Sequence, residues 1–125
     1  MAQAFRAFLV DQHEDQFVGD FKEITLDHLP DGDVTIRVHY SSINFKDMLA
    51  TRAHNKIIRK YPMIPGIDLA GVVMESEHPS FKEGDKVIAT GYDLGVSHYG
   101  GFSEVARVNG DWLVHLPDAV SYTHL

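Results

Sequence analysis

Cysteine is absent from the 125-residue sequence. Its absence excludes disulfides, iron–sulfur clusters, thiolate zinc sites and a cysteine nucleophile. Positive charge is also scarce, because 11 Lys and Arg stand against 18 Asp and Glu, for a formal net charge of −7. A chain this acidic is a poor partner for nucleic acid or for an anionic membrane surface, and we expect it to bind neither.

Long apolar runs and phosphate-binding motifs are missing as well. No apolar run approaches the ~20 residues that cross a bilayer. The first ten residues are apolar around Arg6 but lack the basic start and cleavage site of a secretory signal, so we expect a cytoplasmic protein. The sequence contains no G-x-G-x-x-G, G-x-x-x-x-G-K-[ST] or G-x-S-x-G motif, and therefore no standard phosphate-binding loop or nucleophile elbow.

The residues that are present predict one mainly β domain. Apolar and polar side chains alternate over residues 33–40, which is typical of a half-buried strand. Residues 44–52 change to helical spacing, with Asn44 as the N-cap. The other predicted strands cover residues 4–10, 17–24, 69–76, 86–90, 102–108 and 112–116. Because Asn-Gly favours tight hairpin turns, Asn109 and Gly110 predict a hairpin between the last two strands.

Five segments resemble the catalytic domain of medium-chain dehydrogenases/reductases. Within this superfamily they are most similar to the branch of acrylyl-CoA reductases and YhdH-type quinone oxidoreductases. The segments are SSINFKDMLA (41–50), YPMIPGIDLAGVV (61–73), EGDKVIATG (83–91), HYGGFSEVARV (98–108) and GDWLVHLPD (110–118). The resemblance implies a GroES-like barrel with one or two short helices, the N-terminal domain of an alcohol dehydrogenase-like protein.

The same resemblance predicts how the chain is divided. Residues 1–119 correspond to the GroES-like catalytic domain, which in this family precedes a Rossmann domain that binds NADPH. We expect that nucleotide-binding domain to be missing here, and residues 120–125 to be a non-native or truncated tail. The alternative is a natural single-domain protein.

Three residues at the expected start of the helix are the main site candidates. In the family this segment borders the nicotinamide and the substrate carbonyl, which makes Asn44 and Asp47 candidate catalytic residues, and Asn44 and Phe45 candidate cofactor-binding residues. The Asn44 amide can donate a hydrogen bond to a developing enolate oxygen. The alternative is that Asn44 only caps the helix and Asp47 only stabilises its first turn. Phe45 stands where relatives often carry tyrosine, so it supplies no hydroxyl donor. We expect it to shape the nicotinamide pocket by packing.

A zinc site is not expected. Gly66, Ile67 and Asp68 stand where zinc-dependent relatives carry a Gly-His-Glu motif, so the histidine ligand is missing. The nearest two of the eight histidines are nine residues apart, which is not the spacing of a local metal site. For Asp68 we expect a hydrogen-bonded structural carboxylate, and the alternative is a carboxylate that faces the cleft.

Two further groups are candidate substrate-binding residues. Lys56, Arg59 and Lys60 form a basic cluster that could hold the phosphates of an acyl-CoA, although charge clusters are more often solvated surface. His98 and Tyr99 precede two glycines in a loop that the resemblance places near the cofactor, although a histidine in a loop is commonly a surface residue.

The resemblance implies a zinc-independent, NADPH-dependent oxidoreductase that reduces an activated alkene, either an acrylyl-CoA-like thioester or, more loosely, a quinone. Its partners are then a small-molecule substrate and, for the complete protein, a second copy in a homodimer. NADPH is expected to bind mainly to the missing domain, so this fragment alone should be inactive. The alternative function is a non-enzymatic GroES-like binding or assembly module.

Overall fold

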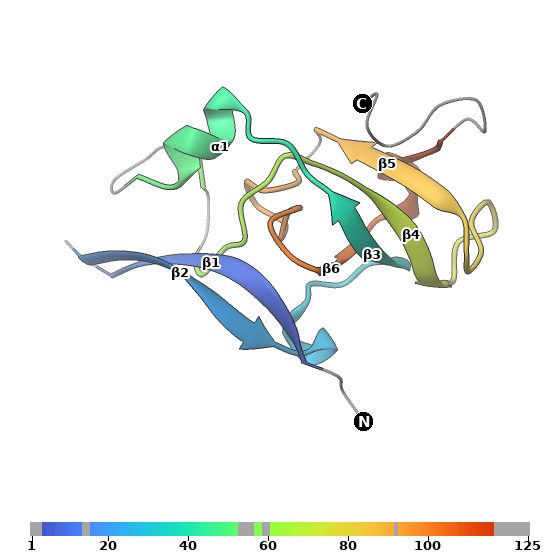
Figure 1. Cartoon of the computed structure of the whole chain (residues 1–125), viewed down its shortest axis with the longest axis horizontal. Coiled ribbons are helices and arrows are strands. Elements are labelled where there is room, and N and C mark those ends of the chain that lie inside the picture. The colour runs from blue at the N-terminus through green and yellow to red at the C-terminus, as the bar shows by residue number, and fades with distance from the viewer. Residues whose placement is uncertain (1–3, 14–15, 53–56, 59–60, 92, 117–125) are drawn as a thin grey trace.

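Two antiparallel sheets and one short helix make up the fold (Figure 1). The computed structural model describes residues 4–13, 16–52, 57–58, 61–91 and 93–116. Strands β1 (Phe5–His13) and β2 (Gln16–Ile24) form a hairpin. The second sheet has the order β6-β3-β4-β5-β7. Its strands are β3 (Val34–Tyr40), β4 (Asp68–Ser76), β5 (Lys86–Thr90), β6 (Val105–Val108) and β7 (Leu113–His115).

The helical elements are short. Helix α1 covers Phe45–Ala50, between β3 and β4, and is the helix that the sequence predicts over 44–52. The 3₁₀ helices η1 (Leu26–His28) and η2 (Gly110–Trp112) lie between strands. The prediction of a mainly β domain with one short helix is therefore confirmed. None of the helices in the described part of the chain is long and apolar enough to span a membrane.

The central strand β3 shows why the alternating pattern was informative. Val34 and Ile36 are fully buried, and Val38 packs on the same core beside Val73 of β4. Thr35, on the other face, is also buried, and its hydroxyl accepts a hydrogen bond from Arg107 Nε at 3.1 Å. The buried Thr35 hydroxyl is thus hydrogen-bonded, as buried polar groups usually are.

The predicted hairpin at Asn109 and Gly110 is wrong. Strand β6 pairs with β3 and β7 pairs with β5, so the two strands lie at opposite edges of the sheet. The Asn109 side chain instead accepts a hydrogen bond from Asp111 N at 2.9 Å and caps η2. An N-cap is the other conformation that asparagine favours, and here it turns the chain from one edge of the sheet to the other.

The hairpin is attached to the rest of the domain along β1. Phe8 N donates to Phe102 O at 2.8 Å, and Val10 exchanges two backbone hydrogen bonds with Met63. The predicted strand 102–108 is split, because Ser103 bridges to Ala7 of β1 whereas β6 begins at Val105 and pairs with β3. This segment therefore crosses from one sheet to the other and closes the fold on one side.

Candidate functional site

Helix α1 buries a charged side chain at its centre and exposes its two largest apolar side chains. Phe45 is 72% exposed and Met48 is 46% exposed, while Ile43 just before the helix is 82% exposed. Asp47, in contrast, is buried at 1% exposure. The helical spacing of the apolar residues predicted the helix correctly, but this apolar side does not face the core. An apolar surface beside a buried carboxylate is the opposite of an ordinary surface helix.

Asp47 is buried because its carboxylate has donors on both oxygens. Ile67 N donates to Oδ1 at 2.9 Å. Asn44 donates to Oδ2 from its backbone N at 3.0 Å and from Nδ2 at 3.2 Å. These contacts complete a capping box at the start of α1 and tie the helix to the segment that enters β4. Desolvation of the carboxylate is thereby offset by hydrogen bonds.

Asp68, at the start of β4, holds the segment on the other side of Asn44. Ser42 donates to it twice, from N to Oδ1 at 2.9 Å and from Oγ to Oδ2 at 2.6 Å. Asn44 Nδ2 donates to Asp68 Oδ2 at 3.0 Å and lies 3.2 Å from Ser42 Oγ. Asp68 is therefore a hydrogen-bonded structural carboxylate, as the sequence analysis expects. Ser42, Asn44, Asp47 and Asp68 together form what we call the polar corner.

Glycines allow the backbone to pack tightly behind the polar corner. A Cβ at Gly101 would lie 2.2 Å from Asp68 O and 2.8 Å from Ser41 Oγ. Gly66 has φ +108°, a conformation that side chains disfavour, and its O accepts a hydrogen bond from Gly101 N at 3.0 Å. The loop before β6 can therefore approach the start of β4 only because these positions lack side chains.

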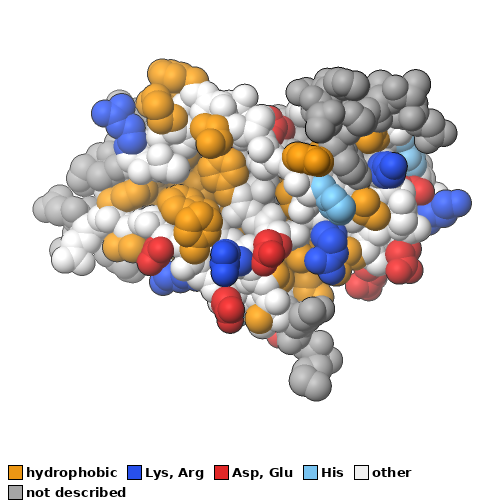
Figure 2. All heavy atoms as spheres, viewed as in Figure 1, with side chains coloured by type: hydrophobic (Ala, Val, Ile, Leu, Met, Phe, Trp, Pro, Cys, Tyr) orange, Lys and Arg blue, Asp and Glu red, His pale blue; other side chains and the backbone are white. Residues whose placement is uncertain are grey.

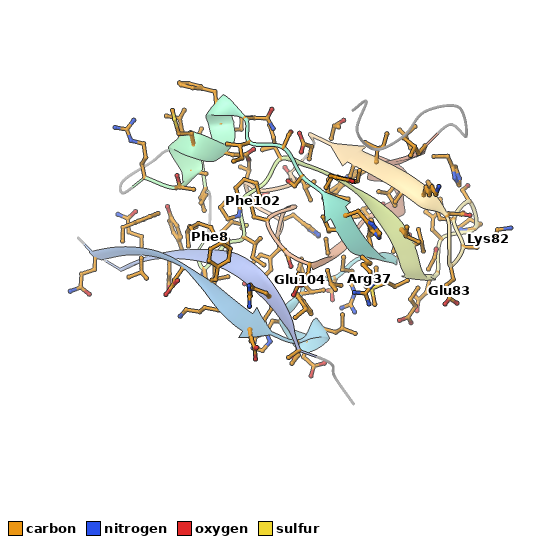
Figure 3. The ribbon with its side chains drawn as sticks, viewed as in Figure 1. Phe8, Arg37, Lys82, Glu83, Phe102 and Glu104 are labelled. Carbon is orange, nitrogen blue, oxygen red and sulfur yellow. The ribbon has the colours of Figure 1, made fainter. Side chains whose placement is uncertain are left out.

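An apolar cleft of about 560 Å³ lies against the polar corner. Its lining residues come from the hairpin, from the segment leading into α1 and from the loop before β6. They are Phe8, Phe21, Ser41, Ile43, Asp47, Met48, Thr51, Gly101 and Phe102. Figure 3 shows Phe8 on β1 and Phe102 on the facing loop, and Figure 2 shows hydrophobic side chains gathered on the side of the molecule that carries the hairpin and α1. A cleft of this size with few polar groups is typical of a small-molecule site.

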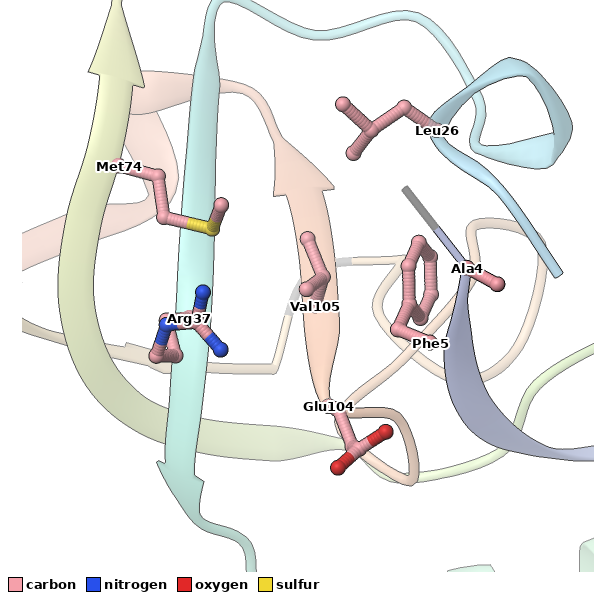
Figure 4. Close-up of a pocket in the computed structure, with 7 residues that line it drawn as sticks. All are labelled: Ala4, Phe5, Leu26, Arg37, Met74, Glu104 and Val105. Atoms are coloured by element: carbon pink, nitrogen blue, oxygen red, sulfur yellow. The ribbon is translucent and has the colours of Figure 1, made fainter. Parts of the chain in front are cut away.

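A smaller hollow of about 200 Å³ lies on the other side of β1. Figure 4 shows Arg37 and Met74 along one side of it, Phe5 on the opposite side and Glu104 at one end. Glu104 accepts a hydrogen bond from Arg6 N at 2.6 Å. This hollow shares no lining residue with the apolar cleft.

The structure separates the predicted site residues. Asn44 and Asp47 lie together in the polar corner, and Phe45 is exposed next to them. His98 Nε2 lies 2.6 Å from Arg107 O, and its ring packs edge-on against Trp112. Lys56, Arg59 and Lys60 lie outside the described residues.

Tyr99 packs against the core on both sides of β1. Burial, and to a smaller extent the charge of Asp11, raises the pKa of the Tyr99 hydroxyl above its ordinary value of 10.0. Neither Tyr99 nor His98 lines the cleft. The substrate contacts predicted for these two residues stay predictions.

Sequence reasoning missed the residues that form most of the cleft. Phe8, Phe21 and Phe102 were assigned only to strands, and Ser42 was assigned no role. They come from distant parts of the chain, and only tertiary folding brings them together. One useful indication was available for Phe102, because it directly follows the glycine pair 100–101 in a loop.

No group of three or more His, Cys, Asp or Glu side chains is placed to hold a metal ion within the described ranges. At the position of the Gly-His-Glu motif of zinc-dependent relatives, Ile67 contributes its backbone N–H to Asp47, and Asp68 binds Ser42 and Asn44. These groups are thus engaged with one another.

The chain is similar to known proteins over most of its length. The acrylyl-CoA reductase AcuI of Ruegeria pomeroyi is 43% identical over 118 residues, 93% of this chain and 36% of that protein. The crystal structure of Bacillus subtilis YhfP with bound NAD has a TM-score of 0.91 at 50% identity, over 95% of this chain and 36% of that one. The NADP complex of the Salmonella enterica YhdH oxidoreductase has a TM-score of 0.89 at 47% identity, over 93% of this chain and 36% of that one.

The chain spans just over a third of the length of these relatives, at 36%. The alcohol dehydrogenase GroES-like domain family matches residues 30–118, which include β3 to β7 and the whole polar corner. The chain belongs to this GroES-like domain family, within the medium-chain dehydrogenase/reductase superfamily, and is similar to its acrylyl-CoA reductase and YhdH-type quinone oxidoreductase branch.

Proposed function

We propose that this chain is the catalytic-domain part of a zinc-independent, NADPH-dependent oxidoreductase that reduces the activated alkene of an acrylyl-CoA-like thioester. The observation that carries the proposal is the aromatic-lined cleft beside the polar corner. An uncharged conjugated group suits the apolar wall, while its carbonyl oxygen needs a polar group nearby. The names of the relatives, an acrylyl-CoA reductase and an NADP-bound oxidoreductase, support this assignment.

The nicotinamide end of NADPH fits the start of α1, whose residues Asp47 and Met48 line the cleft. Phe45 offers an exposed aromatic face and Asn44 a neighbouring amide, a combination suited to a planar ring with a carboxamide. The sequence has no phosphate-binding loop, and we propose that a second domain holds the phosphates, because the chain spans only 36% of its relatives. When bound, NADPH supplies a hydride for the β-carbon of the alkene.

The chain's own residues orient the substrate and stabilise charge. Phe8 and Phe102 exclude water from the conjugated group, which strengthens polar interactions with its carbonyl oxygen. Asn44 has two N–H protons and three acceptors within 3.2 Å, the shortest contact being to Asp68. We place the substrate oxygen where it replaces Asp47 Oδ2 as the acceptor of one Asn44 side-chain N–H, while the other N–H stays on Asp68 and keeps the amide oriented. Asp47 keeps its hydrogen bond from the Asn44 backbone N. Asp47 acts as a positioning residue.

The test is the complete protein, with its nucleotide-binding domain, assayed for NADPH oxidation with acrylyl-CoA and with a benzoquinone. We expect turnover of the thioester to exceed turnover of the quinone. Turnover of the quinone alone would move the substrate class to quinones, and oxidation with neither substrate would contradict the proposal. The isolated 125-residue chain should neither bind micromolar NADPH in titration calorimetry nor reduce the thioester, because the sequence lacks a phosphate-binding loop.

A further inference from the structure

We infer that Phe21 is the specificity-determining residue of the cleft, and that it restricts the substrate to a short, uncharged, planar acyl group. The inference rests on the proposed function and extends it, because it names the part of the substrate that the cleft selects. Phe21 lies on β2, and its side chain is 66% exposed although it lines the cleft. A large side chain that lines the cleft and is yet mostly exposed lies at its edge, and the inference places the path of a longer acyl chain across this edge.

The hairpin holds Phe21 against a second aromatic ring. Phe21 is directly opposite Phe8 in the register of β1 and β2. The two ring centroids are 5.3 Å apart and the planes meet at 70°, an edge-to-face arrangement that aromatic pairs favour. Such cross-strand pairs stabilise a hairpin and fix the direction of both side chains. Phe21 is therefore oriented even though most of its surface is exposed.

Gly19 provides the space for this arrangement. It precedes Phe21 by two residues and so lies on the same face of β2. A Cβ at Gly19 would lie 3.1 Å from Phe8 Cζ, which shows that the Phe8 ring lies over the bare backbone of Gly19. The third ring, that of Phe102, belongs to a segment held against β1, because Phe8 N donates to Phe102 O at 2.8 Å. The three rings thus form one connected wall.

The charge of the lining excludes an ionised acyl end. Among the described residues, Asp47 is the only charged one that lines the cleft, and both of its oxygens already accept hydrogen bonds. No Lys or Arg is among the lining residues in the part of the chain that the structure describes. A free carboxylate placed here would lose its hydration without gaining a cation. The cleft therefore favours the thioester over the free unsaturated acid.

The experiment compares two thioesters in the complete enzyme. Wild type, Phe21→Ala and Phe21→Leu are assayed with acrylyl-CoA and trans-2-hexenoyl-CoA. We expect Phe21→Ala to raise the ratio of kcat/KM for hexenoyl-CoA over acrylyl-CoA at least tenfold, since a methylene in an apolar pocket is worth roughly 10–200-fold. Phe21→Leu should give a ratio between those of wild type and Phe21→Ala. A ratio for Phe21→Ala within twofold of wild type would overturn the inference.

Val18→Ala is the matched control. Val18 lies on the same strand and is 54% exposed, but it does not line the cleft. This variant should leave the ratio within twofold of wild type, and a shift equal to that of Phe21→Ala would overturn the inference. The melting temperature of Val18→Ala should stay close to wild type, whereas Phe21→Ala should lower it modestly, because that change removes the aromatic pair with Phe8.

A binding measurement separates this inference from the proposed function. Saturation-transfer NMR with trans-2-hexenoyl N-acetylcysteamine thioester reports binding to the complete protein without turnover. If the enzyme reduces neither thioester, the proposed function fails, but the Kd of this probe still tests Phe21. We expect Phe21→Ala to lower that Kd at least fivefold, and an unchanged Kd would contradict a role for Phe21 in size selection. Turnover of free acrylate comparable to that of acrylyl-CoA would contradict the exclusion of an ionised acyl end.

Discussion

Asn44 Nδ2 lies 3.0 Å from Asp68 Oδ2, which joins the start of α1 to the start of β4. A carboxylate only accepts hydrogen bonds, so Asp68 determines which end of the Asn44 amide faces it. Asp47, on the other side of the amide, imposes the same orientation at 3.2 Å. The two carboxylates thus hold the Asn44 side chain in a fixed direction, and one of them, Asp47, lines the apolar cleft.

Asn44→Ala tests the catalytic assignment in the complete enzyme. We expect kcat/KM for an acrylyl thioester to fall roughly 10–1000-fold, because losing one donor to a developing oxyanion costs a few kcal/mol. We also expect about 1 kcal/mol of lost stability, because Asn44 caps α1. Steady-state kinetics and the melting temperature of the same variant measure the two effects separately.

Asn109→Ala is the control for that prediction. Asn109 caps η2 through Asp111 N and lies outside the polar corner. It should lower the melting temperature and leave kcat/KM almost unchanged. Near-normal turnover by Asn44→Ala, with a lowered melting point like that of Asn109→Ala, would reduce Asn44 to a cap.

Asp47→Asn should destabilise the domain by about 2–3 kcal/mol, measured by urea unfolding. The backbone N–H groups of Asn44 and Ile67 donate to the two oxygens of Asp47. An amide has only one oxygen, so at least one of these buried donors would lose its acceptor. Asp31→Asn is the matched control, because Asp31 is exposed in the turn before β3. Equal stability of the two variants would contradict the positioning role of Asp47.

Gly101→Ala should cost about 3 kcal/mol, because its Cβ would overlap the backbone at Asp68 O, 2.2 Å away. Gly84→Ala provides the comparison. Gly84 has φ +92° but open space around its Cβ position, so that change should cost only the conformational strain of about 1–2 kcal/mol. Urea unfolding of both variants checks the difference. A smaller loss for Gly101→Ala than for Gly84→Ala would refute the close approach.

The sequence was most informative where local rules decide the structure. Alternation in residues 33–40 located β3, and the spacing of Phe45, Met48 and Leu49 located α1. Local rules failed at Asn109, because asparagine favours both a hairpin turn and a helix N-cap. Which of the two forms depends on the strands that β6 and β7 pair with. Strand pairing over long distances is set by the packing of the whole domain and not by a two-residue motif.

Prediction of the site from sequence was likewise limited to residues that are close together in the chain. Asn44 and Asp47 could be proposed as site residues because they lie three residues apart at a helix start, within a segment that carries the family resemblance. The aromatic wall could not, since Phe8, Phe21 and Phe102 are separated in sequence and each reads as an ordinary strand residue. The apolar face of α1 was likewise visible in the sequence, but its exposure was not.

Zinc content tests the metal assignment. The complete protein should purify without stoichiometric zinc, because the groups at the Gly-His-Glu position bind one another and no thiolate is available in this sequence. Elemental analysis after dialysis against a mild chelator measures this. One zinc per chain that survives the dialysis in wild type, and is lost when Asp68 is replaced, would contradict the assignment.

We expect Tyr99 to make the stability of the folded protein fall as the pH rises above 10. Burial first, and the charge of Asp11 second, raise the pKa of the Tyr99 hydroxyl above 10.0 in the folded protein. Below pH 10 the hydroxyl is neutral in both the folded and the unfolded state, and its contribution to stability is fully present. As the pH rises above 10, the unfolded chain loses this proton first, so the contribution is lost progressively up to the folded pKa.

Titration of ¹³C-labelled tyrosine checks this prediction directly, with Tyr99→Phe assigning the signal. The Tyr99 Cζ shift should titrate above pH 10, and Asp11→Asn should lower its pKa by removing the smaller of the two causes. Wild type should also lose more stability than Tyr99→Phe between pH 8 and pH 11, since only wild type has the hydroxyl that the folded state keeps protonated. Equal losses for the two proteins, or a Tyr99 signal that titrates below pH 10, would show that the folded state does not favour the neutral hydroxyl.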